Sequence, residues 1–286
     1  YNGVGHVTVK YWEVLEIGFE GIMAKAQAEL DGCNVGDGDY ARKSHFLEAV
    51  LLSCQAVIDY AARYAKLAQE MADQTSDPVR KQELLIIAAN CSRVPAKGAQ
   101  NFYEACQSFW FVQQLLQVES SGSFLFRRDV LISICNPYYK KDMETGAITR
   151  GFAQELMDCI WVKFNDLNKC RDAASAEGFA GYSLFQNLIA GGQNKEGEDV
   201  TNDLSIMCIQ ASMHVHLPAP SLSVRVWNGS PHEFLIKAAE LTRTGIGLPA
   251  YYNDEVIIPA LQNRGLSLED ARDYNIIGCV RTTESR

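Results

Sequence analysis

Several signals that would assign a class to this 286-residue chain directly are missing from its sequence. It contains no signal peptide and no apolar run of membrane-spanning length, so we expect neither a secreted nor a membrane-spanning protein. None of its nine cysteines belongs to a Cys-x-x-Cys pair, so a zinc site with the usual ligand spacing is not expected. Internal repeats, low-complexity stretches and clear linkers are also missing.

Basic residues are scarce relative to acidic ones. Lys and Arg number 26 against 35 Asp and Glu, which gives a net charge of −9. This balance argues against nucleic acid or an anionic membrane as a partner, because both are bound through basic patches. Apolar residues make up 47% and charged residues 21%, as in ordinary globular proteins. The irregular cysteines are predicted to be free thiols in the cytoplasm, most of them small core residues.

The first half of the chain has the apolar spacing of helices. The predicted helices cover residues 9–30, 44–74, 79–91, 101–119 and 150–170. The fourth is apolar and aromatic nearly all round, so it is expected to be buried.

The second half alternates short strands with helices. Strands are predicted at 221–227 and 275–280, with helices at 231–244, from Asn253 or Asp254 to Gly265, and after a capping-box variant at Ser267–Asp270. This alternation predicts an α/β fold.

Two polar clusters are weak candidates for a site. His214 and His216 are predicted on one face of a strand, where they could hold a metal, but no third ligand is evident. The segment 191–197 is rich in glycine, yet it lacks the Lys-Ser/Thr of a P-loop and the spacing of a Rossmann fingerprint. It is interpreted as a surface turn.

Cys279 is the third candidate. From spacing alone it ends a buried strand, and an inert buried thiol is the simpler interpretation. Gly278 precedes it and removes a side chain where another group could approach closely.

Several motifs run in order along the chain and carry a resemblance. They are Ala180–Leu188, Gly191-Gly192, Asp199–Ser205, Leu217–Ser223, Asn253–Ala260 and Asp273–Val280. Together they resemble the pyruvate formate-lyase-like domain of glycyl radical enzymes. The likeness is strongest to the branch of glycerol and propanediol dehydratases, 4-hydroxyproline dehydratase and choline trimethylamine-lyase, and it covers nearly the whole chain.

The resemblance implies a fold. Family members form a barrel of about ten strands in two halves, wrapped in helices, with a finger loop that carries a cysteine into the centre. Residues 1–286 are then a partial pyruvate formate-lyase-like domain, mainly helical over 1–175 and a barrel half with the finger loop over 176–286. The radical-bearing glycine would lie beyond residue 286, so the chain is expected to be an internal fragment.

The resemblance also implies a chemistry. Cys279 would be the catalytic thiol, which becomes a thiyl radical and abstracts hydrogen from carbon; Phe185 would line the substrate pocket. The parent enzyme would carry a glycyl radical installed by an iron–sulfur activase that uses S-adenosylmethionine. The chain itself is expected to bind no cofactor and no metal. The expected partners are a small-molecule substrate, the activase and a second copy in a homodimer.

The reaction and the substrate stay open among several alternatives. The favoured one is loss of water from glycerol or propanediol, with hydroxyproline dehydration or choline cleavage as alternatives, towards which Phe185 leans slightly. Formate C-acetyltransferase is a further alternative, but that enzyme has two adjacent cysteines, and here Gly278 precedes Cys279.

Two segments depart from the family pattern. The family has a glutamate two residues after the cysteine, where this chain has Arg281, which keeps its proton and cannot act as a base. The family's substrate-contacting His-Ser is replaced here by Ser123 and Phe124.

Both departures are compatible with reading-frame slips. One synonymous coding of Arg281 to Arg286 is CGA ACC ACA GAA AGC AGG; without its first base it encodes Glu-Pro-Gln-Lys-Ala-Gly, the family motif. A coding of Arg127 to Asn136 read one base earlier restores Gly-Arg-Phe-Asp-Gln-Tyr in the same way. As written, the chain is expected to be inactive alone, and an inactive paralogue or interaction module is the remaining alternative.

Overall fold

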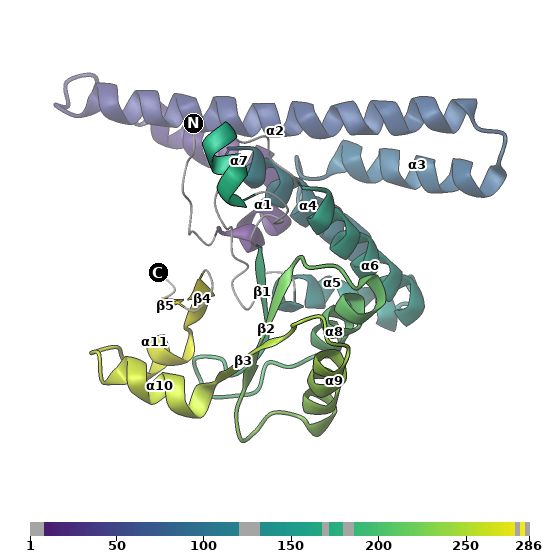
Figure 1. Ribbon diagram of the computed structural model, residues 1–286. Coiled ribbons are helices and arrows are strands. Elements are labelled where there is room, and N and C mark those ends of the chain that lie inside the picture. The colour runs from purple at the N-terminus through teal and green to yellow at the C-terminus, as the bar shows by residue number, and fades with distance from the viewer. Residues whose placement is uncertain (1–8, 120–131, 168–171, 180–185, 278–280, 284–286) are drawn as a thin grey trace. The chain divides into compact units, whose positions relative to one another are not determined.

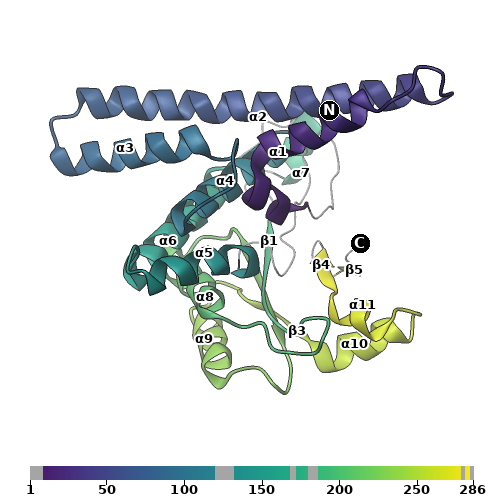
Figure 2. The same cartoon turned by 180° about the vertical axis from the view of Figure 1, so that it is seen from behind.

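The computed structural model describes residues 9–119, 132–167, 172–179, 186–277 and 281–283 of the chain. It divides into two compact units. The first, called the helical unit, comprises Lys10–Leu115; the second, called the sheet unit, comprises Leu116–Arg286 together with Tyr1–Val9. Figures 1 and 2 show the elements of each unit from opposite sides.

The helical unit contains four helices. They are α1 (Tyr11–Asp31), α2 (Tyr40–Gln74), α3 (Pro78–Arg93) and α4 (Phe102–Glu119), whose last residues belong to the sheet unit. On α2 the buried positions are small, at Ala61, Ala65, Ala68 and Ala72. Their spacing of three and four residues places them on one face, where α3 packs closely against them. These helices confirm the periodicity of the first half of the sequence.

Gly18 interrupts α1 with a left-handed conformation, φ 67°. A Cβ at this position would lie 2.2 Å from the carbonyl oxygen of Ala96, so only glycine fits. The backbone amides of Phe19 and Glu20 donate to the carbonyls of Pro95 and Ala96, both at 2.9 Å. The kink therefore lets the segment after α3 hydrogen-bond directly to α1.

The sheet unit alternates helices with strands. Its elements are α5 (Ile132–Glu144), α6 (Arg150–Asp166), α7 (Ala173–Phe179), β1 (Asn187–Gly191), α8 (Asp203–Val215), β2 (Ser221–Val226), α9 (His232–Arg243), β3 (Ala250–Asn253), α10 (Asp254–Gln262), α11 (Leu268–Arg272), β4 (Asn275–Ile277) and β5 (Arg281–Thr283). Strands β1, β2 and β3 form a parallel sheet in that order, and β4 and β5 form an antiparallel pair. In both ribbon views α8 and α9 lie on one side of the parallel sheet and α10, α11 and β4 on the other (Figures 1 and 2).

Strand β2 is buried on both of its faces. Leu222 and Val224 are fully buried and alternate with Ser223 and Arg225, which are buried as well. Because side chains alternate across a strand, one face of β2 is apolar and the other polar. The polar face belongs to the side with α10, α11 and β4, since Arg225 hydrogen-bonds to Asp254 of α10.

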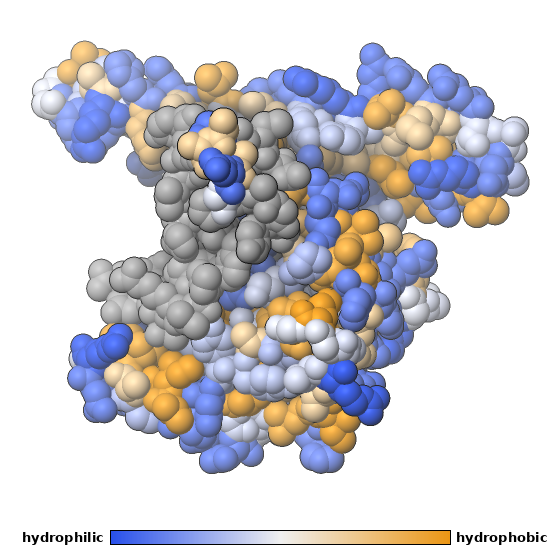
Figure 3. All heavy atoms as spheres, in the orientation of Figure 1, coloured by the Kyte–Doolittle hydropathy of each residue, from blue (hydrophilic) through white to orange (hydrophobic). Residues whose placement is uncertain are grey.

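Helix α10 is apolar on both its inner and outer sides. Ile258 and Leu261 are buried against Tyr274 and Ile276, whereas Val256 is 64% exposed. Figure 3 shows hydrophobic residues, in orange, gathered over this helix. Among the described residues no helix combines the length and apolarity needed to cross a membrane.

One local prediction was wrong, one helix was missed, and one predicted strand is described only in part. Helix α5 was missed, because its residues 132–136 were attributed to a frame slip and Pro137 lies inside it. His214 lies in the last turn of helix α8 and His216 is its left-handed C-cap, so neither belongs to a strand. The strand predicted at 275–280 is described only over Asn275–Ile277, where it pairs with the unpredicted β5.

Candidate functional site

A short antiparallel hairpin is the candidate site. In it Ile276 is opposite Thr282, and Ile277 is opposite Arg281. Three residues, 278–280, connect the two strands, and the central one is Cys279. The predicted catalytic cysteine thus lies, in sequence, between β4 and β5, and its own position is outside the described residues.

The other predicted site residues also fall outside the part of the chain that the structure describes. This holds for Ser123, Phe124 and Phe185. Arg281 is described only as a backbone position in β5. Their assignment to a common site therefore stays a prediction, and the described geometry concerns the base of the hairpin.

A buried ion pair contacts the main chain that leads into β4. Arg225 of β2 and Asp254 of α10 are both fully buried. The guanidinium donates twice to the carboxylate, from Nε to Oδ1 and from Nη2 to Oδ2, each at 2.8 Å. The backbone amide of Gln193 donates to Oδ2 at 3.3 Å. A bidentate pair of this kind fixes the direction of both side chains as well as their distance.

Tyr274, the residue before β4, completes the cluster. Its hydroxyl donates to Oδ1 of Asp254 at 2.8 Å, and its ring lies 3.8 Å from the Cζ atom of Arg225. Burial, the largest cause, raises the pKa of Tyr274 well above its ordinary value, although the nearby guanidinium of Arg225 acts in the opposite direction. The phenol is therefore a neutral donor throughout the physiological range.

Arg225 also holds the main chain that leads into β4. Its Nη2 donates to the carbonyl of Arg272 at 2.9 Å, and its Nη1 to the carbonyl of Tyr274 at 3.3 Å. A second contact comes from β1, where Nδ2 of Asn187 donates to the carbonyl of Ile276 at 3.3 Å. The hydroxyl of Ser223 donates to Oδ1 of Asn187 at 2.9 Å.

Gly192 makes room for the guanidinium. Its φ is +91°, and a Cβ there would lie 2.7 Å from Nε of Arg225. The interpretation of 191–197 as a surface turn was therefore wrong for its first residues: Gly191, Gly192 and Gln193 are buried, and only the residues that follow reach the surface. The glycines serve close packing instead of a turn.

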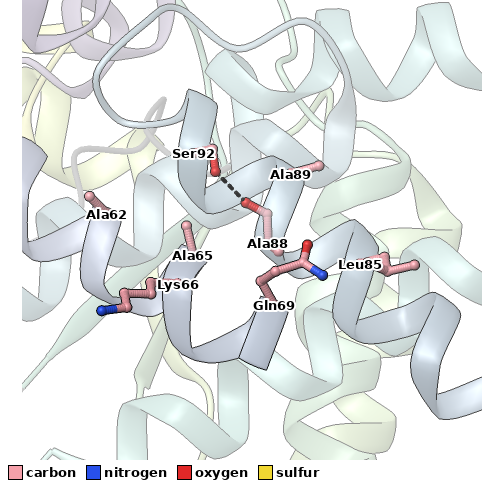
Figure 4. Close-up of a pocket in the computed structure, with 8 residues that line it drawn as sticks. All are labelled: Ala62, Ala65, Lys66, Gln69, Leu85, Ala88, Ala89 and Ser92. Carbon is pink, nitrogen blue, oxygen red and sulfur yellow. Dashed lines mark hydrogen bonds between the residues drawn. The ribbon is translucent and has the colours of Figure 1, made fainter. Parts of the chain in front are cut away.

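The helical unit contains a groove that lacks the buried polar groups found near the hairpin. A groove of about 520 Å³ lies between α2 and α3 and is lined largely by alanines, among them Ala62, Ala65, Ala88 and Ala89 (Figure 4). Lys66 is the one ionisable side chain among its lining residues. The hydroxyl of Ser92 is already bonded to the carbonyl of Ala88 at 2.8 Å. The groove has no pair of groups that could act as acid and base.

A metal centre finds no support in the described ranges, where no three His, Cys, Asp or Glu side chains come together. Of the two histidines considered earlier, His214 contacts Oδ2 of Asp158 through Nδ1 at 2.9 Å. That contact ties α8 to α6 at a partly exposed position.

Sequence reasoning missed the residues at the base of the hairpin. Asp254 was considered only as a helix cap, whereas Asn253 caps α10 by accepting from the amide of Glu255 at 2.9 Å. Asp254 is thereby left to point inward. Arg225 offered one signal, an arginine within an apolar alternating strand, because buried charges need partners.

A family model described as pyruvate formate lyase-like matches residues 1–286. A solved structure of 1,2-propanediol dehydration in Roseburia inulinivorans is 63% identical, with a TM-score of 0.93, and covers 99% of this chain and 34% of that one. The glycerol-bound B12-independent glycerol dehydratase from Clostridium butyricum is 55% identical, with a TM-score of 0.91, covering 99% and 36%.

More distant relatives share the same region. The trans-4-hydroxy-L-proline dehydratase of Clostridioides difficile is 36% identical over 255 residues, which is 89% of this chain and 32% of the relative. The chain thus spans about a third of the length of the curated relatives it matches. The likeness to solved structures confirms the predicted fold class, a helix-rich segment joined to part of a glycyl radical enzyme barrel.

Proposed function

The chain belongs to the pyruvate formate lyase-like family, and we propose that it is the cysteine-bearing third of a glycyl radical enzyme that removes water from a small diol. The observation that carries this proposal is the hairpin of β4 and β5. In sequence, Cys279 falls between these two short paired strands, and buried polar side chains hydrogen-bond to the backbone that leads into β4.

The proposed reaction uses the thiol as a hydrogen shuttle. A glycyl radical elsewhere in the whole protein, installed by an activase, supplies the unpaired electron. The Cys279 sulfur then takes a hydrogen atom from the carbon that bears one hydroxyl, water leaves from the neighbouring carbon, and the thiol returns the hydrogen atom. For 1,2-propanediol the sum is propanal and water. Thiolate chemistry could not break a carbon–hydrogen bond of this kind.

A diol is the substrate class that the comparisons support. Identity is 63% and 55% to the proteins that act on propanediol and glycerol, against 36% to the hydroxyproline dehydratase. This difference outweighs the single indication from Phe185 towards hydroxyproline or choline. The proposed partners are the diol, the activase and a second copy of the whole enzyme.

A specific observation favours a second candidate, an inactive paralogue. Arg281 stands where an acid/base partner is expected, and an arginine does not release its proton. We propose that this arginine results from a frame slip. Reading the source DNA tests it: an in-frame arginine codon at 281 with intact flanks would overturn the frame slip and favour the paralogue.

The enzymatic proposal is tested with the full-length, in-frame protein, its activase and S-adenosylmethionine under anaerobic conditions. Propanal is expected from 1,2-propanediol, and Cys279→Ser is expected to abolish it while the glycyl radical signal remains. Cys159→Ser, at an exposed cysteine on α6, is the matched control and is expected to keep full activity. Unchanged turnover in Cys279→Ser would overturn the proposal. The 286-residue chain alone is expected to form no propanal.

A further inference from the structure

We propose that Asn187 and Arg225 are positioning residues that hold the cysteine hairpin at a fixed register against the parallel sheet. The inference rests on the proposed function, because the register matters for catalysis only if Cys279 reacts. It extends that function by assigning roles to residues that do not need to touch the substrate.

The first step is the way β4 is attached. In the described part of the chain β4 pairs with β5 alone, and the parallel sheet ends at β1 and β3. No main-chain ladder therefore joins the hairpin to the sheet over these residues. A ladder would fix the register of β4 through several main-chain hydrogen bonds. Without one, the register of β4 against the sheet has to be fixed by side-chain contacts.

The second step is that side chains from the sheet take over this role. Asn187 donates to the carbonyl of Ile276, and Arg225 donates to the carbonyls of Arg272 and Tyr274. These three acceptors lie on alternate residues of one segment, which ends three residues before Cys279. Side chains of β1 and β2 thus form hydrogen bonds to the main chain of the segment that precedes Cys279 in sequence.

The third step is that both donors are themselves held. Oδ1 of Asn187 accepts from Ser223, which orients the amide so that Nδ2 points to Ile276. The guanidinium of Arg225 is locked by its bidentate bond to Asp254. All four side chains are at most 2% exposed, so water does not compete for these bonds.

The consequence is geometric. A strand advances about 3.3 Å per residue, and a slip of one residue reverses the direction of every side chain. Hydrogen transfer needs reacting atoms about 3–3.5 Å apart, and a misplacement of about 1 Å costs roughly 100-fold in rate. Loosening the anchor is therefore expected to reduce kcat about 10- to 100-fold and to leave KM within about twofold.

Ser223→Ala in the full-length, in-frame enzyme is the main test, because it frees Asn187 without adding bulk or charge. Its matched control is Ser212→Ala, which removes another buried hydroxyl of the sheet unit, bonded to Nε1 of Trp161 at 2.8 Å. A loss of kcat in Ser223→Ala with unchanged KM and radical yield, and no loss in Ser212→Ala, is the expected result. Equal kcat in both variants would overturn the proposal.

A second pair separates the hydrogen bond from packing. Threonine and valine have the same shape, so Ser223→Thr and Ser223→Val impose the same crowding, but only threonine keeps the hydroxyl. Ser223→Thr is expected to retain more kcat than Ser223→Val by about 10-fold or more. Equal loss in the two would assign the effect to packing and overturn the role of the hydroxyl.

Hydrogen exchange gives a measurement that does not depend on turnover. In the unactivated full-length enzyme, amides of β4 and β5 are expected to exchange about 10-fold faster in Ser223→Ala than in wild type, while α6 and α8 are unchanged. Unchanged exchange in the hairpin would overturn the anchor even in an active enzyme. Conversely, an inactive wild type with the expected exchange would refute the diol reaction and retain the anchor.

Discussion

The two units of the chain differ in one respect: among the described residues, only the sheet unit contains an ion pair that is completely buried. In the helical unit the ion pairs lie mostly at the surface, such as Arg80 with Glu83, whose side chains are 49% and 53% exposed. In the sheet unit Arg225 and Asp254 form an ion pair with no exposure at all. The helical unit packs alanines and aromatics, whereas the sheet unit buries charge directly beneath the hairpin of Cys279.

This difference indicates what each unit is built to do. Burying two charges costs several kcal/mol of desolvation per ion, which apolar packing would avoid. A unit that needs only to fold can rely mainly on apolar contacts, as Ala61, Ala65 and Cys91 do between α2 and α3. The sheet unit carries a buried pair in which Arg225 makes two further hydrogen bonds to the main chain before Cys279. Positioning of that segment is the gain that offsets the cost.

The largest effect is expected from breaking the buried pair. Asp254→Ala leaves the Arg225 guanidinium buried without its counter-ion and is expected to cost about 3–5 kcal/mol of unfolding free energy. Glu83→Ala, in the exposed pair of α3, is expected to cost under about 1 kcal/mol. Urea unfolding of both variants, with hydrogen exchange to report each unit separately, measures the difference. Similar losses would contradict the contrast between the units.

The next effect concerns one glycine in each unit. Gly18→Ala would bring a Cβ to 2.2 Å from the carbonyl oxygen of Ala96, and Gly192→Ala to 2.7 Å from Nε of Arg225. Both glycines have positive φ, so each change is expected to cost about 2–4 kcal/mol, more at Gly18, where the obstacle is backbone. Thermal unfolding of the two variants measures the loss.

Gly38→Ala is the control for the glycine variants. A Cβ at this position meets nothing within 4 Å, and the φ of Gly38 lies outside the left-handed range. Its unfolding free energy is expected to change by less than about 0.5 kcal/mol. A loss at Gly38 comparable to that at Gly18 would show that crowding is not the cause.

The unfolding free energies of the two units are expected to depend differently on alkaline pH, because each unit contains a buried thiol with a raised pKa. Burial raises the pKa of Cys91 in the helical unit from 9.0 to about 11, and that of Cys135 in the sheet unit to about 12. Below pH 9 both thiols are neutral in the folded and unfolded states. Above pH 9 the unfolded state loses its proton first, so stability falls as pH rises towards the folded pKa.

For Cys91 the expected loss is about 2–3 kcal/mol between pH 9 and pH 11. Cys91→Ala removes this part of the pH dependence, and Cys135→Ala removes a part that extends to about pH 12. Urea midpoints measured at intervals across this range give the slopes. A slope that Cys91→Ala leaves unaltered would contradict the assignment.

The smallest expected effect should be equal in the two units. Asp77 caps α3 by accepting from the amide of Val79 at 2.9 Å, and Thr149 caps α6 by accepting from the amide of Phe152 at 3.1 Å. Alanine at either position is expected to cost about 1 kcal/mol, because a cap depends on local backbone geometry. Chemical unfolding tests both, and a several-fold difference would show that tertiary context dominates even at exposed helix ends.

Much of the helical architecture could be predicted from local pattern. The α2 prediction began at residue 44 and ended at 74, and α2 covers Tyr40–Gln74. The caps of α10 and α11 were predicted as well, and the hydroxyl of Ser267 accepts from the amide of Asp270 at 3.0 Å. These features depend on contacts within a few residues, so their signal lies in adjacent sequence.

The candidate site was predictable only in part. The assignment of Cys279 came from ordered motifs and stays a prediction, as do Phe185, Ser123, Phe124 and Arg281. The residues beneath the hairpin gave little local signal, because Asn187 and Ile276 are 89 positions apart in sequence. Helix α5 was missed for another reason, since an unusual segment was attributed wholly to a frame slip.

The sequence by itself determined most of the helices of the first half, the alternation of β2 and the family, and it predicted Cys279 as the catalytic cysteine. Spacing and motif order are local or linear properties, and they can be read without knowing which segments meet. Only the tertiary structure decided that the polar face of β2 is buried, that Gly192 makes room for Arg225, and that Asn187 reaches the strand before Cys279. The physical reason is that burial and pairing depend on segments distant in sequence, and a serine or arginine in an alternating strand looks the same whether water or a hairpin covers it.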